Sequence, residues 1–435
     1  MICNGAKYIS KLVNCLWILS FIFFSCNSLR SLTLRHDLKH SEIFTNQFTG
    51  FCLYDPSTNY ILSSYHADRH FTPASNMKIL TALATLETFG DSLPSYNYQL
   101  KGDSLIIQPL ADPTFLHPKF PSQPAFSLLK EHDVFISWIN SPLDEFGAGW
   151  AWDDFQYDFQ PERSWFPIYG NTIRIFRNSD SIHVVPEFFK DYTQINYGEK
   201  PGDYIRRDQK YNLFNIWIEN NYSSFEREIP YDYDRELLAR LLSDTINRPV
   251  QFVDPEQYAC PETAFNQSTL NVVANMMLAS DNFLAEQLLI QVALANGYEN
   301  VDLFRSVLQE KWSTFNPNDF QWYDGSGLSR YNLISPLSLV AILKRIYDIE
   351  TWERIKIIFP NGGRSGTIKD WYHGDPPYVF AKTGTLKNNH NLSGYLQTQS
   401  GRILIFSIMN NNHVAPVSEV KKEMEKLLRK IWKKL

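Results

Sequence analysis

Residues 74–83, Ala-Ser-Asn-Met-Lys-Ile-Leu-Thr-Ala-Leu, decide how this chain is interpreted. Apolar residues recur at helical spacing from Met77 to Leu86, so the stretch predicts a helix that begins near Ser75. Ser75 and Lys78 would lie on one face of that helix, about one turn apart. An amine in that position can take the proton of the hydroxyl and turn a weak nucleophile into a strong one.

Two further motifs follow in the chain. Ser280-Asp281-Asn282 is expected on a turn within the helical stretch 268–296, and Lys382-Thr383-Gly384 on a strand. The pattern S-x-x-K alone is common by chance. Three motifs in this order, on a helix start, a turn and a strand, are much harder to obtain by chance than one. Together they predict a single three-sided site.

Chemical roles for the polar side chains follow from their types. We expect Ser75 to be the nucleophile and Lys78 the base that removes its proton. The hydroxyl of Ser280 can relay a proton between Lys78, Lys382 and a leaving amine. The side-chain amide of Asn282 can accept a hydrogen bond from Lys78 and donate one to a substrate carbonyl.

The strand motif predicts the contacts for substrate binding. Lys382 supplies positive charge, and the hydroxyls of Thr383 and Thr385 can donate to a substrate carboxylate. Gly384 is expected to let a substrate backbone approach the strand edge, which is how strand-adding peptides are recognised. The backbone N–H groups of Ser75 and Thr385 would form an oxyanion hole.

Other kinds of site find no support in the sequence. The chain has no G-x-S-x-G elbow, no H-E-x-x-H or Cys/His cluster of metal spacing, and no phosphate-binding loop, so neither a metal nor a cofactor is expected. The net charge is −6, and no basic stripe interleaved with aromatic residues occurs, so nucleic acid is not an expected partner.

The amino terminus predicts secretion. Lys7 and Lys11 precede an apolar run over residues 12–24, which is typical of a signal peptide and too short to predict a membrane span. We therefore assign residues 1–26 to a signal peptide. Cys26 lies where a lipoprotein would be cut and acylated, but a plain cleaved signal and an uncleaved membrane anchor stay open.

Two cysteines, Cys52 and Cys260, lie beyond the predicted signal peptide. In an oxidising compartment they could pair, yet two cysteines make no disulfide framework. A disulfide and two buried free thiols therefore both stay open.

The order of expected elements predicts an α+β fold. An antiparallel sheet between helix layers would be made from both ends of the chain, residues 27–90 and 251–435. Residues 91–250 are rich in aromatic residues, prolines and short β-like runs, and they predict a β-rich inserted region. The expected elements at the two ends are a hairpin over 48–65, helices over 75–90, 268–296 and 335–349, strands over 378–385, 391–397 and 402–409, and a closing helix.

These motifs resemble the low-molecular-mass class C penicillin-binding proteins, which are D-alanyl-D-alanine carboxypeptidases and endopeptidases. One segment of the chain is close to a segment of that family: Tyr323-Asp324-Gly325-Ser326-Gly327-Leu328-Ser329-Arg330. Two segments of the inserted region also resemble the family, Asp112-Pro113-Thr114 and Gly149-Trp150-Ala151-Trp152-Asp153-Asp154. The resemblance implies a β-lactamase/transpeptidase-like fold and explains the insertion as extra domains. The chain departs from the family in having Leu110-Ala111 before Asp112, and its insertion is shorter than in the larger members.

The resemblance implies a secreted, periplasmic serine peptidase that cleaves peptidoglycan stem peptides through an acyl-enzyme. Penicillins and other β-lactams would acylate the same serine, Ser75. Two alternatives stay open: a β-lactamase or esterase on the same scaffold, and a non-enzymatic cell-wall binding protein. The second alternative predicts loss of the nucleophile or of Lys78, and both are present. The balance between carboxypeptidase and endopeptidase action also stays open.

Overall fold

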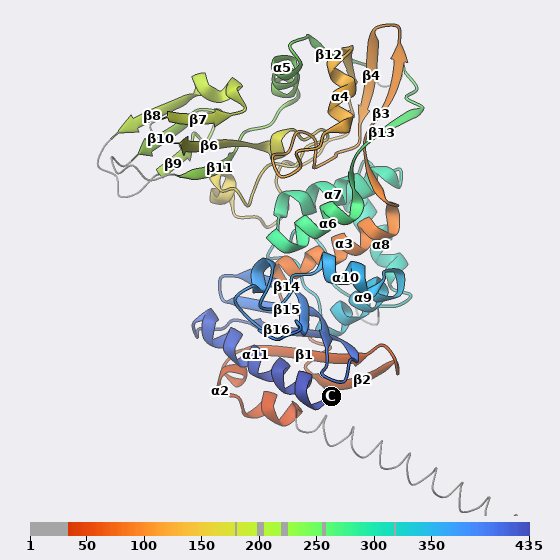
Figure 1. Cartoon of the computed structure of the whole chain (residues 1–435), viewed down its shortest axis with the longest axis vertical. Helices are drawn as coiled ribbons and strands as arrows, with labels where there is room; N and C mark the ends of the chain where they lie inside the picture. The colour runs from red at the N-terminus through yellow and green to blue at the C-terminus, as the bar shows by residue number, and fades with distance from the viewer. Residues whose placement is uncertain (1–33, 179–180, 198–203, 219–224, 255–257, 317–318) are drawn as a thin grey trace, which may run out of the picture.

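The computed structural model describes residues 34–178, 181–197, 204–218, 225–254, 258–316 and 319–435. The predicted signal peptide and the prediction for Cys26 lie outside these residues. Figure 1 shows two parts stacked along the long axis of the molecule, with both ends of the described chain in the lower one.

The lower part is built on an antiparallel sheet of five strands in the order β14-β15-β16-β1-β2. Strand β1 pairs with β16, which joins the beginning of the described chain to its end. Both of these central strands are almost wholly buried, as their nearly continuous apolar sequences require when both faces of a sheet are covered. The strands are β1 (Phe48–Asp55), β2 (Tyr60–Tyr65), β14 (Val379–Leu386), β15 (Asn389–Gln397) and β16 (Ile403–Asn411).

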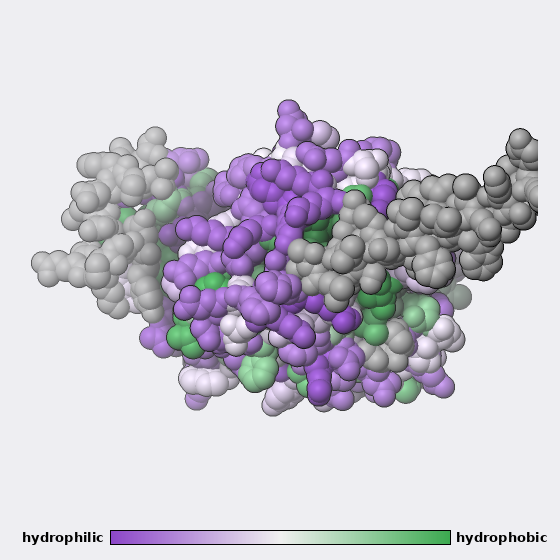
Figure 2. Space-filling model, turned by 90° about the horizontal axis from the view of Figure 1, so that it is seen from below, coloured by the Kyte–Doolittle hydropathy of each residue, from purple (hydrophilic) through white to green (hydrophobic). Residues whose placement is uncertain are grey.

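Helices cover both faces of this sheet, which confirms the predicted α+β arrangement. On one face α2 (Glu42–Thr45) and α11 (Val417–Lys434) enclose an apolar core that includes Met424 and Leu428. Figure 2 shows the surface at this end, where most of the visible side chains are hydrophilic. The helices on the side of the other face are α3 (Lys78–Thr88), α6 (Thr269–Ala279), α7 (Asn282–Ala295), α8 (Val301–Trp312), α9 (Pro336–Ile349) and α10 (Trp352–Ile358).

The upper part is an inserted region with its own apolar core and three sheets. A mixed sheet has the strand order β12-β5-β4-β3-β13, and two three-stranded sheets have the orders β11-β6-β7 and β8-β10-β9. In Figure 1 the two smaller sheets project to one side, above the lower part. The elements are β3 (Ser92–Lys101), β4 (Ser104–Pro109), α4 (Pro124–Lys130), β5 (Asp133–Ser137), η2 (Trp152–Gln156), η3 (Tyr169–Asn171), β6 (Thr172–Asn178), β7 (Ser181–Val185), η4 (Glu187–Tyr192), β8 (Thr193–Tyr197), β9 (Tyr204–Arg207), β10 (Phe214–Ile218), β11 (Glu226–Pro230), α5 (Arg235–Ile246), β12 (Val250–Val253) and β13 (Glu262–Ser268).

Strand pairing shows that the inserted region ends later in the chain than residue 250, the predicted boundary. Strand β12 pairs with β5, and β13 pairs with β3, so that Ser268 lies opposite Ser92. The chain therefore leaves and re-enters the lower part at one place. The second segment of the lower part begins at α6, whose first turn is capped by the Ser268 hydroxyl, and not at residue 251.

The two cysteines of the described chain are free thiols. Cys52 is buried on β1, where burial raises the pKa of its thiol to about 12. Cys260 lies in the inserted region and is only half-buried. The sequence left open a disulfide or two buried free thiols. The structure has no disulfide between Cys52 and Cys260.

Candidate active site

The predicted nucleophile lies on a tight turn rather than inside an α-helix. Residues Ala74–Met77 form a 3-10 helix, η1, and α3 begins only at Lys78. Ala74 has a left-handed backbone (φ +50°), which costs an L-residue roughly 1–2 kcal/mol. The turn is supported by Gly327, where a Cβ atom would lie 2.0 Å from the carbonyl oxygen of Ala74. Ser75 is thus held, partly exposed, on a strained and closely packed turn.

The amine of Lys78 is fully buried and has three polar neighbours. Its Nζ donates to Asn282 Oδ1 at 2.5 Å and to the carbonyl oxygen of Ser326 at 2.7 Å, and it lies 3.2 Å from Ser75 Oγ. The first two neighbours can only accept hydrogen bonds. A neutral amine would therefore give them its two N–H groups and keep its lone pair for the proton of the Ser75 hydroxyl.

The electrostatics of the site allow a minor fraction of Lys78 to be neutral near physiological pH. Burial lowers the pKa of Lys78 to about 8, against the attraction of the carboxylates of Asp324, Glu286 and Asp281. Burial, and then the charge of Lys78, hold the pKa of Lys382 well below its usual range. Two buried amines thus share one site, and neither can hold a proton as firmly as it would in water.

The second motif lies at the junction of two helices. Ser280 ends α6 with a left-handed backbone (φ +58°), and its Oγ accepts a hydrogen bond from Lys382 Nζ at 2.8 Å. Asp281 caps α7 by accepting from the backbone N–H of Leu284 at 3.0 Å. Asn282 is the first residue of α7, so this residue of the predicted turn is already helical.

The third motif lies on β14, the edge strand of the sheet. The N–H of Ala381 points out of the sheet, because it donates to the carbonyl of Pro360 at 3.0 Å. Alternate residues of a strand direct their backbone groups to the same edge. The backbone groups of Thr383 and Thr385 therefore also face outward, as strand addition by a peptide requires.

The hydroxyls of the two threonines already have protein partners. Thr383 Oγ1 lies 2.7 Å from Thr367 Oγ1, and Thr385 Oγ1 lies 2.8 Å from His390 Nδ1. A substrate carboxylate would therefore have to share these hydroxyls with the protein or take them over.

Gly384 has a different neighbour from the one that its sequence context suggested. A Cβ atom at this position would lie 2.2 Å from the carbonyl oxygen of Pro73 and 3.0 Å from the backbone nitrogen of Asn76. The missing side chain makes room for the turn that carries Ser75, and not for a substrate backbone. Glycine here is what lets the strand and the nucleophile turn lie side by side.

The segment around Ser326 contributes functional groups that the sequence did not predict. The Ser326 N–H donates to Glu286 Oε1 at 2.7 Å, which holds the neighbouring carbonyl in place for Lys78. Asp324 Oδ1 accepts from the N–H of Gly327 at 2.9 Å and from Asn332 Nδ2 at 2.7 Å. The similarity of residues 323–330 to a known family pointed to this segment, but not to a backbone carbonyl as the functional group.

The part of the chain that the structure describes contains neither a candidate metal site nor a candidate membrane span. Apart from the gaps given above, residues 34–435 contain no group of three or more His, Cys, Asp or Glu side chains placed to hold a metal ion. Over the same residues, no helix has both the length and the apolar character needed to cross a lipid bilayer.

Comparison with known proteins identifies the family. The sequence profile of the D-Ala-D-Ala carboxypeptidase 3 (S13) family matches residues 33–115 and 263–431, together more than half of the chain. The chain belongs to this family. The unmatched stretch between the two segments falls within the inserted region of this S13 protein.

Individual relatives of the S13 chain agree with this assignment. It is 25% identical over 412 residues to D-alanyl-D-alanine carboxypeptidase DacB of Haemophilus influenzae, over 82% of this chain and 84% of that protein. It is 22% identical over 451 residues to penicillin-sensitive carboxypeptidase A of Dictyostelium discoideum, over 85% and 83% of the two chains. Its fold is similar to the crystal structure of penicillin-binding protein 4 from H. influenzae, with a TM-score of 0.71 and 20% identity over 93% of this chain and 99% of that chain.

The family assignment confirms the predicted resemblance and the predicted class of enzyme. The protein is a serine-type D-alanyl-D-alanine carboxypeptidase of the S13 family. The likeness to penicillin-binding protein 4 confirms the predicted fold class.

Proposed function

We propose that this S13 protein removes the terminal D-alanine of peptidoglycan stem peptides through an acyl-enzyme on Ser75. The observation that carries the proposal is the position of the Lys78 amine. Two acceptors fix its orientation, and its remaining direction points to Ser75 Oγ at 3.2 Å. This is the arrangement that a general base for a serine nucleophile needs.

In the acylation step, Ser75 Oγ attacks the carbonyl carbon of the penultimate D-alanine and its proton passes to Lys78 Nζ. The negative charge on the carbonyl oxygen is stabilised by the backbone N–H groups of Ser75 and Thr385. When the C–N bond breaks, the leaving amine takes the proton of the Ser280 hydroxyl. Lys382, which donates to Ser280 at 2.8 Å, replaces that proton.

The acyl-enzyme is then hydrolysed. Water attacks the ester carbonyl and gives one proton to Lys382, which the acylation step left neutral. As the C–O bond breaks, Lys78 returns its proton to Ser75. The carboxylic acid that is released keeps the second proton of the water and loses it to solvent. In this scheme Asn282 and the Thr383–Thr385 edge position the peptide. Lys382 and the two threonine hydroxyls bind its terminal carboxylate.

β-Lactams are proposed to acylate Ser75 by the same route, because a penicillin presents its lactam carbonyl and its carboxylate at a separation similar to that of the scissile carbonyl and terminal carboxylate of D-Ala-D-Ala. Crystals of the related penicillin-binding protein 4 from H. influenzae have been obtained in complex with a β-lactam. We place the site of action outside the cytoplasm, in the periplasm, where peptidoglycan lies. Anchoring to the membrane through the amino terminus, by lipidation of Cys26 or by an uncleaved leader, is part of the same proposal.

The test is release of D-alanine from a stem pentapeptide that ends in D-Ala-D-Ala, measured by mass spectrometry. We expect loss of one alanine residue with the intact chain and none with Ser75→Ala. A digest of cross-linked peptidoglycan in the same assay separates carboxypeptidase from endopeptidase action, because only the latter converts dimeric muropeptides to monomers. An intact chain that releases nothing from either substrate would refute the proposal.

A further inference from the structure

An ion pair links the inserted region to the second motif. Lys119 Nζ, from the loop between β4 and α4, lies 2.6 Å from Asp281 Oδ2. Asp281 is flanked in the chain by Ser280 and Asn282, both of which the mechanism uses. We infer that Lys119 is a positioning residue, which holds Asp281 and thereby the hydroxyl of Ser280 and the amide of Asn282 in their reactive places. The inference rests on the proposed function.

Both carboxylate oxygens of Asp281 are in use. Oδ1 accepts from the N–H of Leu284 in α7, and Oδ2 accepts from Lys119 in the inserted region. The Asp281 side chain is only 11% exposed, whereas the Lys119 side chain, which approaches from the solvent side, is 41% exposed. The backbone N–H groups of Ser280 and Asp281 both donate to the carbonyl of Met276, which closes α6 with Ser280 in its left-handed conformation. A carboxylate bound through both oxygens adds to these bonds by fixing the side chain of the residue next to Ser280.

The loop that carries Lys119 is itself held in place. The backbone N–H of Lys119 donates to His117 Nδ1 at 3.1 Å. Burial lowers the pKa of His117 to about 4, so its ring is neutral and can accept this bond at neutral pH. The ring lies 5.5 Å from that of Phe120 and 6.0 Å from that of Phe283, the residue after Asn282. The backbone from which the Lys119 side chain reaches Asp281 is therefore held in place.

Further contacts fasten the inserted region around Lys78. Trp150 Nε1 donates to Asp324 Oδ2 at 2.8 Å, and the carbonyl of Phe159 accepts from Asn282 Nδ2 at 2.8 Å. Arg163 lies 3.9 Å from Glu286. The inserted region is therefore part of the site. Lys119 is the residue of this region that forms an ion pair with the Ser280-Asp281-Asn282 motif.

The two members of this ion pair change each other's pKa values. Burial opposes both charges, but the ammonium of Lys119, with His117, holds the pKa of Asp281 below its usual range, and Asp281 raises that of Lys119. Lys119 also lines a hollow of about 820 Å³. The titratable groups that face the three side chains are Glu228 and Asp158 around Lys119, His117 beside Asp281, and Asp324, Glu286, Asp281 and Lys382 around Lys78.

Removing the charge of Lys119 would leave the Asp281 carboxylate without its counter-ion. An uncompensated negative charge favours the protonated form of Lys78, so the amine would become neutral only at higher pH. The rise of the acylation rate with pH should therefore move to higher pH. A role of Lys119 in stability alone would not move it.

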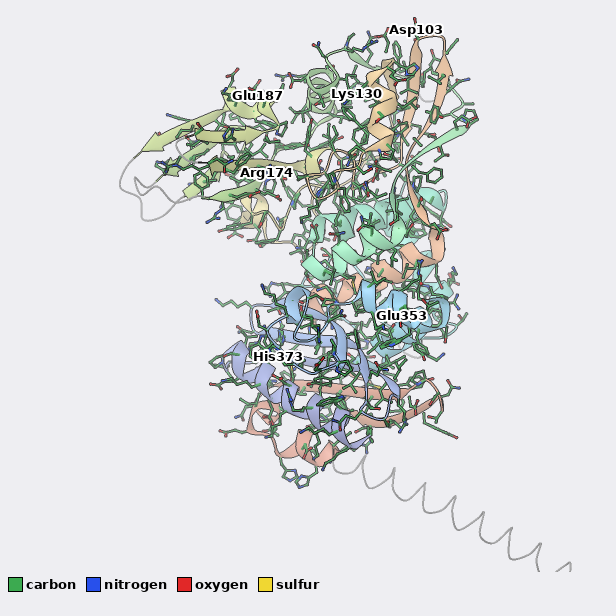
Figure 3. The ribbon with its side chains drawn as sticks, viewed as in Figure 1. Asp103, Lys130, Arg174, Glu187, Glu353 and His373 are labelled. Atoms are coloured by element: carbon green, nitrogen blue, oxygen red, sulfur yellow. The ribbon has the colours of Figure 1, made fainter. Side chains whose placement is uncertain are left out.

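The experiment compares Lys119→Met, Lys119→Arg and the matched control Lys130→Met in the full chain. Lys130 is exposed on α4, and Figure 3 shows it in the upper part of the inserted region, away from α6 and α7. The measured quantity is the second-order rate constant for acylation by a fluorescent penicillin between pH 6 and 9. Circular dichroism melting checks that each variant is folded.

We expect Lys119→Met to react at least about tenfold more slowly at pH 7, since misplacing reactive groups by an ångström costs up to ~10²-fold. Its profile should also move to higher pH. Lys119→Arg should stay within about threefold of the wild-type rate because it keeps the charge, and Lys130→Met should be unchanged.

A Lys119→Met variant with the wild-type rate and pH profile would overturn the inference, as would a Lys119→Arg variant that is as slow as Lys119→Met. If Lys119→Met does not fold, Lys119→Gln replaces it in the same comparison. Should neither neutral variant fold while Lys119→Arg behaves as wild type, the ion pair serves stability and the inference is overturned. A wild-type chain that is not acylated at Ser75 would instead refute the proposed function.

Discussion

The protonation of Lys78 should set the pH dependence of acylation. With a pKa of about 8, the amine is neutral in roughly 1% of molecules at pH 6, about 10% at pH 7 and about 90% at pH 9. Only the neutral form can accept the proton of Ser75. We therefore expect the second-order rate constant for acylation to rise on the order of 90-fold between pH 6 and 9, with its midpoint near 8.

The assay is rapid-quench labelling with a fluorescent penicillin, read by gel fluorescence, with protein integrity checked by circular dichroism at each pH. Lys78→Met is the matched variant, because it keeps the length of the side chain and removes the amine. Its residual rate should be low and should lack the rise near pH 8. A wild-type rate that is flat from pH 6 to 9, or a rise with its midpoint below 6, would refute the role of Lys78 as a neutral base.

Two further outcomes follow from the packing and charge of the site. Gly327→Ala should lose acylation and lower the melting temperature by more than Gly401→Ala does. Both glycines have φ +86°, but a Cβ atom at residue 327 would meet the carbonyl oxygen of Ala74 at 2.0 Å, whereas one at residue 401 would meet nothing within 4 Å. Equal losses of acylation and melting temperature in the two variants would contradict this packing argument. Lys382→Met should lower the acylation rate constant by about 10²-fold or more, because it removes the donor to Ser280 and the positive charge for a carboxylate; a rate within threefold of wild type would show that Lys382 has neither role.

The parts of the site that could be predicted are those whose chemistry depends on side-chain type and local spacing. Ser75 and Lys78 are one turn apart whatever the rest of the chain does, and their contact follows from that spacing. The order of the three motifs then predicted that Asn282 and Lys382 would join them. The structure brings Asn282 to Lys78, and Lys382 to Ser280, as that order implied.

Other parts depend on contacts between distant residues and on backbone groups, which leave no local pattern. The acceptor at Ser326 is a carbonyl, and every residue has one. The absence of a side chain at Gly384 matters because the strand packs against Pro73, more than three hundred residues earlier in the chain. The pairing of Lys119 with Asp281 is set by the fold of the inserted region.

The sequence predicts the end of the inserted region too early for a similar reason. Residues 251–268 contain β13, which returns to pair with β3 at the start of the insertion. Such a pairing joins segments about 170 residues apart. No composition change at residue 250 could indicate that the sheet still lacked its last strand.

The central claim, that Ser75 is the nucleophile of an acyl-enzyme, is tested most directly by mass spectrometry after incubation with a penicillin. The account predicts that the intact protein gains the mass of one penicillin, that peptide mapping places the adduct on Ser75, and that Ser75→Ala gains nothing. An unmodified intact protein, an adduct on another residue, or equal modification of Ser75→Ala would contradict it.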